Sequence, residues 1–282
     1  MRLRPMPVIM ISSLTARGSE ATLQALELGA VDYVAKPEAQ NAGRLQGYAE
    51  EIRDKIRAAY QARLCGGAAQ MAAVPAGRPT LVSPLPASTL HEAVIAIGAS
   101  TGGTEALKTV LAEWPAEMPP ILIVQHMPES FTPSFARRLD SLCALEVIEA
   151  QGGERLRPGT AYLAPGHSHL SIRRQAGGYV TELSQAPPVN RHRPSVDVLF
   201  SAVAREAKQN ALGVILTGMG KDGAQGLWEM RQAGSWNIGQ DRDSCVVYGM
   251  PRVAFELGAL NDVAPLDAIA GRVLAQLRRA NR

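Results

Sequence analysis

The sequence is poor in cysteine and contains no long apolar run. Its 282 residues include three cysteines, Cys65, Cys143 and Cys245, which lie far apart and show no C-x-x-C spacing. This pattern argues against a disulfide framework and against a zinc cage. No apolar stretch approaches the roughly 18 to 20 residues that a membrane-spanning helix needs. The apolar run after residues 1–4 is too short for a signal peptide, and no plausible cleavage site follows it. We therefore expect a cytoplasmic protein.

The sequence also lacks a strong charge of either sign. Lysine and arginine number 29, aspartate and glutamate 26, and the formal net charge is +3, with 5% aromatic residues. The basic residues are scattered and form no stripe interleaved with aromatics, so we expect no nucleic-acid partner. We also expect no metal, no cofactor and no membrane insertion, with a monomer as the default.

Two patterned regions flank a stretch rich in glycine, alanine, proline and serine. We divide the chain into residues 1–62, a linker at 63–91, and a domain at 92–282. The second region alternates short apolar runs with helical patterns, which predicts an α/β fold with a doubly wound, mostly parallel, Rossmann-like three-layer sheet. The predicted strands are 7–13, 31–35, 94–97, 121–124, 161–164 and 211–216, with a hairpin at 170–183 and helices at 19–29, 43–64, 104–113 and 223–232.

The apolar run at 95–97 ends in Gly98-Ala99-Ser100-Thr101-Gly102-Gly103. A serine on a tight strand-to-helix turn is held up for attack, and the N–H groups at the helix start face incoming negative charge. The same glycines suit a phosphate cradle. On this motif alone, a hydrolase and a nucleotide-binding domain are equally well supported, and a plain glycine-rich connector is the simplest alternative.

A serine hydrolase also needs a base and an orienting carboxylate. Of the five histidines, His126 directly follows the strand pattern at 121–125, and Asp222 follows the strand and glycine-rich turn at 213–220. Both are then expected at the sheet edge that presents Ser100. The alternatives are a strand-capping histidine and an N-cap aspartate. His192 lies in a basic loop, where we expect contact with substrate or solvent. The order serine, histidine, aspartate differs from that of α/β-hydrolases.

Several long blocks between residues 94 and 266 give the chain a specific resemblance to a known family. They include Ile97–Gly103, Gln125–Pro128, Tyr162–Gly166, Pro187–Phe200, Leu216–Gly223 and Ser244–Pro251. In these blocks the chain resembles the bacterial chemotaxis protein-glutamate methylesterases of the CheB type, many of which are also glutamine deamidases.

The resemblance implies that Ser100 is the nucleophile, His126 the base and Asp222 the acid. It also implies that the backbone N–H groups of Thr101 and Met219 form the oxyanion hole. The implied substrates are glutamate methyl esters, and selected glutamines, on the cytoplasmic helices of methyl-accepting chemotaxis receptors.

The basic loop containing Asn190, Arg191 and Arg193 is expected to meet these acidic helices, on electrostatic grounds. Its alternative is an ordinary solvated loop. A nucleotide-binding module and an idle receptor-docking fragment are the competing functions. The sequence has no P-loop lysine, and it retains all three candidate catalytic residues.

Residues 1–37 resemble the C-terminal part of a receiver domain, with Ser12 as the hydroxyl switch residue and Lys36 as the phosphate-contacting lysine. The receiver's phosphoacceptor aspartate is expected before this point. We therefore expect a truncated receiver, without aspartate phosphorylation or a supported histidine-kinase contact. We expect residues 1–40 to fold poorly alone or to lean on the catalytic domain. In this family the unphosphorylated receiver covers the active site.

One segment departs from the family pattern. Asn237 stands where the family usually has threonine, and Gly239 where it usually has alanine. We expect these two residues to loosen a strand locally.

Overall fold

The computed structural model describes residues 6–12, 15–36, 45–62 and 85–279. Cys65 and most of the predicted linker lie outside these ranges. The end of the predicted linker is helical, because α3 spans Ala87–Glu92. Among the described residues, no helix combines the length and apolar character needed to cross a membrane.

The main body is built on a seven-stranded sheet in which every neighbouring pair is parallel, in the order β11-β10-β9-β3-β4-β6-β5. This confirms the predicted doubly wound parallel fold. The strands are β3 (Val94–Ala99), β4 (Ile121–Gln125), β5 (Glu146–Glu149), β6 (Thr160–Leu163), β9 (Ala211–Ile215), β10 (Trp236–Gln240) and β11 (Asp262–Ala264). The chain moves outward from β3 through β4 and then returns to β9 on the other side, so the strand order reverses beside β3. Ligands of open α/β sheets bind at such a switch point, outside the carboxyl ends of the strands.

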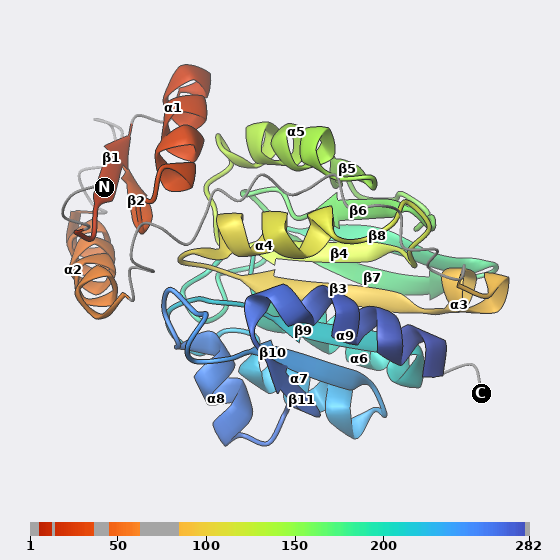
Figure 1. Cartoon of the computed structure of the whole chain (residues 1–282). Helices are drawn as coiled ribbons and strands as arrows, with labels where there is room; N and C mark the ends of the chain where they lie inside the picture. Colours follow the sequence, from red (N-terminus) through yellow and green to blue (C-terminus); the bar gives the residue numbers. More distant parts are fainter. Residues whose placement is uncertain (1–5, 13–14, 37–44, 63–84, 280–282) are drawn as a thin grey trace.

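Helices cover both faces of this sheet (Figure 1). The helices are α4 (Gly103–Ala112), α5 (Thr132–Leu142), α6 (Val196–Glu206), α7 (Ala224–Gln232), α8 (Met250–Glu256) and α9 (Leu266–Arg279). Successive residues of β3 alternate between the two cores: Ile95 and Ile97 pack with α4, α5 and α9, whereas Val94 and Ala96 pack with α6, α7 and α8. Burial on both faces explains why β3 is a continuous apolar run rather than an alternating one.

The predicted hairpin is present as the antiparallel pair β7 (His169–Gln175) and β8 (Gly178–Ser184). It packs through Leu170 and Ile172 on the core that α6 and α7 cover. A single turn of 3-10 helix at Lys208–Asn210 leads from α6 into β9.

A smaller N-terminal segment consists of β1 (Ile9–Ser12), α1 (Ala16–Glu27), β2 (Asp32–Ala35) and α2 (Leu45–Gln61). Its two strands pair in parallel. Leu23 and Leu26 of α1 and Tyr33 of β2 join the core of the main body, and the Tyr33 ring stacks on Phe131 with 4.6 Å between centroids. The helix α1 begins at Ala16, earlier than expected, because the Thr15 side chain caps it by accepting the Gly18 N–H.

The expectation of a loosened strand around Asn237 is wrong. Asn237 is fully buried in β10, and its Nδ2 donates to the carbonyl oxygens of Leu227 and Ala259 at 2.8 and 2.9 Å. A Cβ on Gly239 would lie 2.5 Å from Leu260 Cδ1, so the side chain of Leu260 occupies the space beside this glycine. Asn237 therefore fastens β10 to its neighbours.

Candidate active site

Three loops at the carboxyl ends of adjacent strands form the site. Ser100 follows β3, His126 follows β4, and Asp222 lies in the loop after β9. In Figure 1 these strand ends face the N-terminal segment. The sheet thus brings together three residues that are separated by up to 122 positions in the sequence.

Backbone contacts hold the three loops against one another. The Ser100 N–H donates to the Thr217 carbonyl at 3.0 Å, and the His126 N–H donates to the Ala99 carbonyl at 3.1 Å. A Cβ on Gly218 would lie 2.8 Å from the Cβ of Ser100. Only glycine permits this approach, so the loop after β9 lies directly against the serine.

His126 and Asp222 form a buried pair. His126 Nε2 lies 2.8 Å from Asp222 Oδ2. Because a carboxylate accepts the proton of the nitrogen it faces, Nε2 carries the hydrogen and Nδ1 is left as the basic nitrogen. Nδ1 is buried and has no partner among the described residues. The imidazole is therefore oriented with its free lone pair available to a proton donor.

Asp222 is the centre of a hydrogen-bond network at the start of α6. Its oxygens accept from the Ser195 hydroxyl at 2.8 Å, the Asn190 Nδ2 at 2.8 Å and the Val196 N–H at 2.7 Å. Burial acts to raise the pKa of Asp222, but the hydrogen bond and charge of His126 and these donors hold it well below its ordinary value. The carboxylate of Asp222 is therefore ionised at neutral pH and can accept the Nε2 proton of His126.

The alternative interpretation of Asp222, as the N-cap of the helix after it, is not what the structure shows. The residue before α7 is Gly223, and no side chain caps that helix. Asp222 instead meets the N-terminus of α6, a helix 26 residues before it, where the helix dipole favours negative charge.

The backbone amides of Thr101 and Met219 flank the serine from two loops. Within the described part of the chain, neither N–H donates a hydrogen bond to a protein acceptor. Both residues line one cavity of about 820 Å³ together with Ser100, His126 and Asp222. Two unused donors beside a candidate nucleophile are what an oxyanion hole requires.

The N-terminal segment forms part of the wall of this cavity, through Asp32, Tyr33 and Ala35 of β2 and Glu50, Asp54 and Lys55 of α2. Asp32 Oδ2 accepts the Thr101 hydroxyl at 2.5 Å. Lys55 Nζ bridges Asp32 and the Tyr33 carbonyl at 3.2 and 2.5 Å. The segment therefore contacts a residue of the proposed oxyanion hole directly.

The glycines after β3 serve packing. A Cβ on Gly102, which has a φ of +77°, would lie 2.6 Å from Val246, and a Cβ on Gly103 would lie 2.2 Å from Gln125 Oε1. Side chains thus fill the space beside both glycines, and this leaves little room there for a cradled phosphate.

The three residues of the expected substrate loop have different surroundings. Asn190 donates to Asp197 as well as to Asp222, at 2.6 Å, so it belongs to the carboxylate network. Arg193 donates to the carbonyl oxygens of Gln185 and Ala186. Arg191 is exposed and lies 3.9 Å from Asp54 of α2. All three residues line the cavity.

His192 lines the main cavity, where its contact with substrate stays a prediction, and it makes a further contact that the sequence did not indicate. Its ring stacks on that of His126, with centroids 3.6 Å apart and planes inclined by 11°. The neighbouring residues Arg191 and Arg193 indicated an exposed basic loop, so the sequence did not predict this contact.

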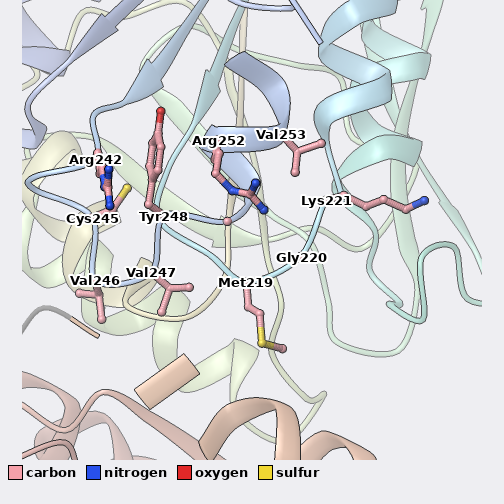
Figure 2. Close-up of a pocket in the computed structure, with 11 residues that line it drawn as sticks. Met219, Gly220, Lys221, Arg242, Cys245, Val246, Val247, Tyr248, Arg252 and Val253 are labelled. Atoms are coloured by element: carbon pink, nitrogen blue, oxygen red, sulfur yellow. The ribbon is translucent and has the colours of Figure 1, made fainter. Parts of the chain in front are cut away.

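A second cavity, of about 830 Å³, lies on the other side of Met219 (Figure 2). Lys221, Arg242 and Arg252 line it, together with Tyr248. Arg252 projects from α8, whereas Arg242 and Tyr248 come from the loop between β10 and α8 (Figure 2). The main cavity thus borders a positively charged hollow.

Neither described cysteine offers an alternative nucleophile. Burial, with a smaller contribution from Asp241, raises the pKa of the Cys245 thiol to about 12, and burial, with Asp140, raises that of Cys143 to about 11. Both thiols are therefore protonated at neutral pH and weakly nucleophilic. Among the described residues, no three histidine, cysteine or acidic side chains are arranged to hold a metal ion.

Ser12 and Lys36, the expected receiver residues, lie at the ends of β1 and β2. The Lys36 N–H donates to the Ser12 carbonyl at 2.7 Å, and the Ser12 hydroxyl donates to the Gly18 carbonyl at 3.1 Å. The parallel pairing therefore brings the two residues together at one edge, and their receiver roles remain a prediction.

Comparisons with known proteins agree with this architecture. A family model described as CheB methylesterase matches residues 95–273. The chain is 59% identical over 274 residues, 97% of its length and 78% of the relative's, to a protein-glutamate methylesterase/protein-glutamine glutaminase 1 of Dechloromonas aromatica. It is 56% identical to one of Nitrosomonas europaea, over 100% of this chain and 79% of that one.

A solved structure gives the same result. The crystal structure of the Thermotoga maritima CheB methylesterase catalytic domain matches with a TM-score of 0.64 and 39% identity, over 65% of this chain and 98% of that one. The fold and site define a doubly wound α/β domain with a serine, a histidine and an aspartate at its switch point. The chain belongs to the CheB methylesterase family.

Proposed function

We propose that this chain is a serine esterase that hydrolyses glutamate methyl esters on chemotaxis receptors and deamidates selected glutamines there. The observation that carries the proposal is the buried 2.8 Å pair of His126 and Asp222, beside Ser100 and two unused amides in one cavity. The relatives in this family bear the names of both activities.

In the first step, His126 Nδ1 accepts the proton of the Ser100 hydroxyl while Oγ attacks the ester carbonyl. Asp222 stabilises the imidazolium that forms and keeps its orientation. The carbonyl oxygen becomes an oxyanion, to which the N–H groups of Thr101 and Met219 donate. His126 then protonates the departing methoxide, and methanol leaves an acyl-serine.

In the second step, His126 removes a proton from water, which attacks the acyl carbonyl. The Ser100 alkoxide leaves and recovers its proton from the imidazolium, releasing a glutamate side chain. A glutamine follows the same route, with ammonia as the first product. The orientation of His126 is the same in both cases, because the leaving group receives its proton from the same nitrogen.

The substrate side chain belongs to a larger protein, and the second cavity would accommodate residues of that protein next to the reacting side chain. Each turnover turns a neutral ester into a carboxylate, so a substrate segment with several such sites becomes acidic. The second cavity is lined by Lys221, Arg242 and Arg252. Their positive charges would attract the carboxylates of that segment. Arg191 at the mouth of the main cavity adds a further positive charge.

The test is methanol release from radiomethylated chemoreceptor membranes, comparing the parent with Ser100→Ala. Release by the parent that falls by roughly a million-fold in the variant, as for other serine hydrolases that lose their nucleophile, would support the proposal. Equal release by the two proteins would exclude Ser100 as the nucleophile. The exposed Ser141→Ala serves as the matched control and should behave as the parent does, since the Ser141 hydroxyl donates to the Arg138 carbonyl at the surface, outside the cavity lining.

A further inference from the structure

The ring of His192 is the nearest aromatic group to the proposed base. It lies parallel to the His126 ring, with 3.6 Å between centroids and an interplanar angle of 11°. Asp222 already holds the edge of His126 at Nε2. The stack therefore covers one face of an imidazole whose edge is fixed and whose Nδ1 is free.

The backbone that presents His192 is in a costly conformation. Val189 and His192 exchange N–H to carbonyl hydrogen bonds at 3.1 and 2.9 Å, which closes a two-residue turn. The two central residues, Asn190 and Arg191, have φ values of 50° and 69°. Left-handed backbone is unfavourable for residues other than glycine, and it persists only where the surroundings impose it.

Asn190 shows what imposes the turn. Its Nδ2 bridges the carboxylates of Asp222 and Asp197, at 2.8 and 2.6 Å. The same aspartate therefore orients His126 directly and holds, through Asn190, the turn that places His192. The carboxylate of Asp222 thus positions both imidazole rings, that of His126 directly and that of His192 through Asn190.

We propose that His192 is a positioning residue for the proposed reaction, which keeps His126 in its reactive orientation by covering one face of its ring. The inference rests on the proposed function of His126. A stacked ring resists rotation of the base out of the plane of Asp222 and excludes water from that face. The attacking geometry is thereby fixed before substrate arrives.

The stack requires that His192 stay uncharged when His126 becomes an imidazolium, because two cations at this spacing would repel. The groups that face His192 are His126 and Asp222 of the main site, Lys55 of α2 and Arg191 of its own turn. Burial, followed by the positive groups His126, Lys55 and Arg191, lowers the pKa of His192 to about 3, against the attraction of Asp222. A neutral ring face then stabilises the cation beside it.

The test compares His192→Ala and His192→Phe, since phenylalanine keeps a flat ring but has no titrating nitrogen. We expect kcat for methanol release to fall about 10- to 100-fold in His192→Ala with KM little changed, because the base loses its orientation. His192→Phe should stay within about threefold of the parent.

A readout that does not need activity separates this inference from the proposed function. In the proton NMR spectrum, the ring current of His192 should displace the His126 ring protons upfield. His192→Ala should abolish the displacement, and His192→Phe should retain it. The matched control is His91→Ala, which removes an exposed histidine at the end of α3 and should alter neither rate nor shift.

The outcomes are distinct. A His192→Phe variant as slow as His192→Ala, with its fold intact, would overturn the proposal, because the ring nitrogens would then be essential. A parent rate in His192→Ala, or the absence of an upfield displacement in the parent, would overturn it as well. A parent without any Ser100-dependent hydrolysis would count against the proposed function, while the NMR comparison would still decide whether His192 positions His126.

Discussion

The main body and the N-terminal segment differ in what holds them in place. The central strand β3 is fully buried on both faces of a seven-stranded sheet. The N-terminal strands form a two-stranded sheet, which is not stable in isolation. In this segment Ile11 and Tyr60 are 57% and 88% exposed. The main body therefore carries its own core, whereas the order of the N-terminal segment depends on contact with it.

That contact is mixed in character. Besides the stack of Tyr33 on Phe131, the Ser19 hydroxyl donates to the Ser130 carbonyl at 2.9 Å, and Glu27 pairs with Arg138. The partly exposed pair of Glu27 and Arg138 contributes little, and the hydrogen bond of the buried Ser19 contributes about 1 kcal/mol. The difference teaches that catalytic geometry belongs to the main body, whereas part of the cavity wall belongs to a segment that is more weakly held.

The largest expected effect comes from breaking the geometry of the main body. Asp222→Asn should lower kcat for methanol release by about 1,000- to 10,000-fold, since an amide that donates to Nε2 favours the wrong tautomer of His126. The asparagine oxygen can still accept the Asn190 amide and the Ser195 hydroxyl in the place of Oδ1, so the fold should survive although the Val196 N–H loses its acceptor. Circular dichroism would check the fold, and single-turnover kinetics the chemical step. A loss below about tenfold would show that Asp222 does not orient the base.

Removing the N-terminal segment tests whether this segment limits access of the substrate to the cavity. A chain of residues 86–282 lacks the wall that β2 and α2 contribute to the cavity. The crystallised catalytic domain of the Thermotoga maritima relative supports independent folding of this part. If the cavity is open in about a tenth of molecules, kcat/KM for receptor demethylation should rise about tenfold. Ser100→Ala in the same fragment should abolish the gain. An unchanged rate would mean that the segment does not limit access.

The pH dependence of stability reports on the junction of the two regions. The pKa of His192 is lowered to about 3 in the folded chain, whereas in the unfolded chain it is near 6.5. The unfolded state therefore binds more protons between these values, and stability falls as pH falls through this window. From pH 7 to 5 the loss should reach about 1 to 2 kcal/mol.

Urea unfolding at the two pH values would measure this loss in the parent and in His192→Phe, which should show less of it. The fragment 86–282 should show a smaller loss than the parent, because it lacks Lys55 and the cavity wall that β2 and α2 contribute. An equal loss in parent and variant would assign the pH dependence to other groups.

Local patterns in the sequence predict the parts of the site that directly follow strands. Ser100 and His126 each come after a run of apolar residues, and the sheet brings such strand ends together. Asn190 and His192 carry no comparable signal. Their contacts reach across 32 and 66 positions, and they depend on a left-handed turn whose only local cue is the tolerance of asparagine for that conformation.

The strands that the sequence pattern missed also have physical explanations. β10 contains Asn237 and Gln240, polar residues that are buried because each hydrogen-bonds the backbone of a neighbouring segment. β5 and β11 are short edge strands with Glu146 and Asp262 among their residues. Hydrophobic periodicity detects burial of apolar side chains and is blind to both cases.

The smallest expected effect distinguishes Asp32 from Asp54, two of the three carboxylates of the N-terminal segment that line the cavity. Asp32→Asn weakens the acceptor that holds the Thr101 hydroxyl and removes the ionic partner of Lys55. A neutral acceptor costs this contact about 0.5 to 1 kcal/mol relative to a charged one, so kcat/KM should rise about two- to fivefold as the segment loosens. Asp54→Asn removes the same charge from the same cavity without touching Thr101, and its exposed contact with Arg191 contributes little. Initial rates of receptor demethylation would compare the two variants. Equal increases would show that the charge of the cavity matters rather than the contacts of Asp32, whereas an increase confined to Asp32→Asn would locate the coupling of the two regions at the contacts of Asp32 with Thr101 and Lys55.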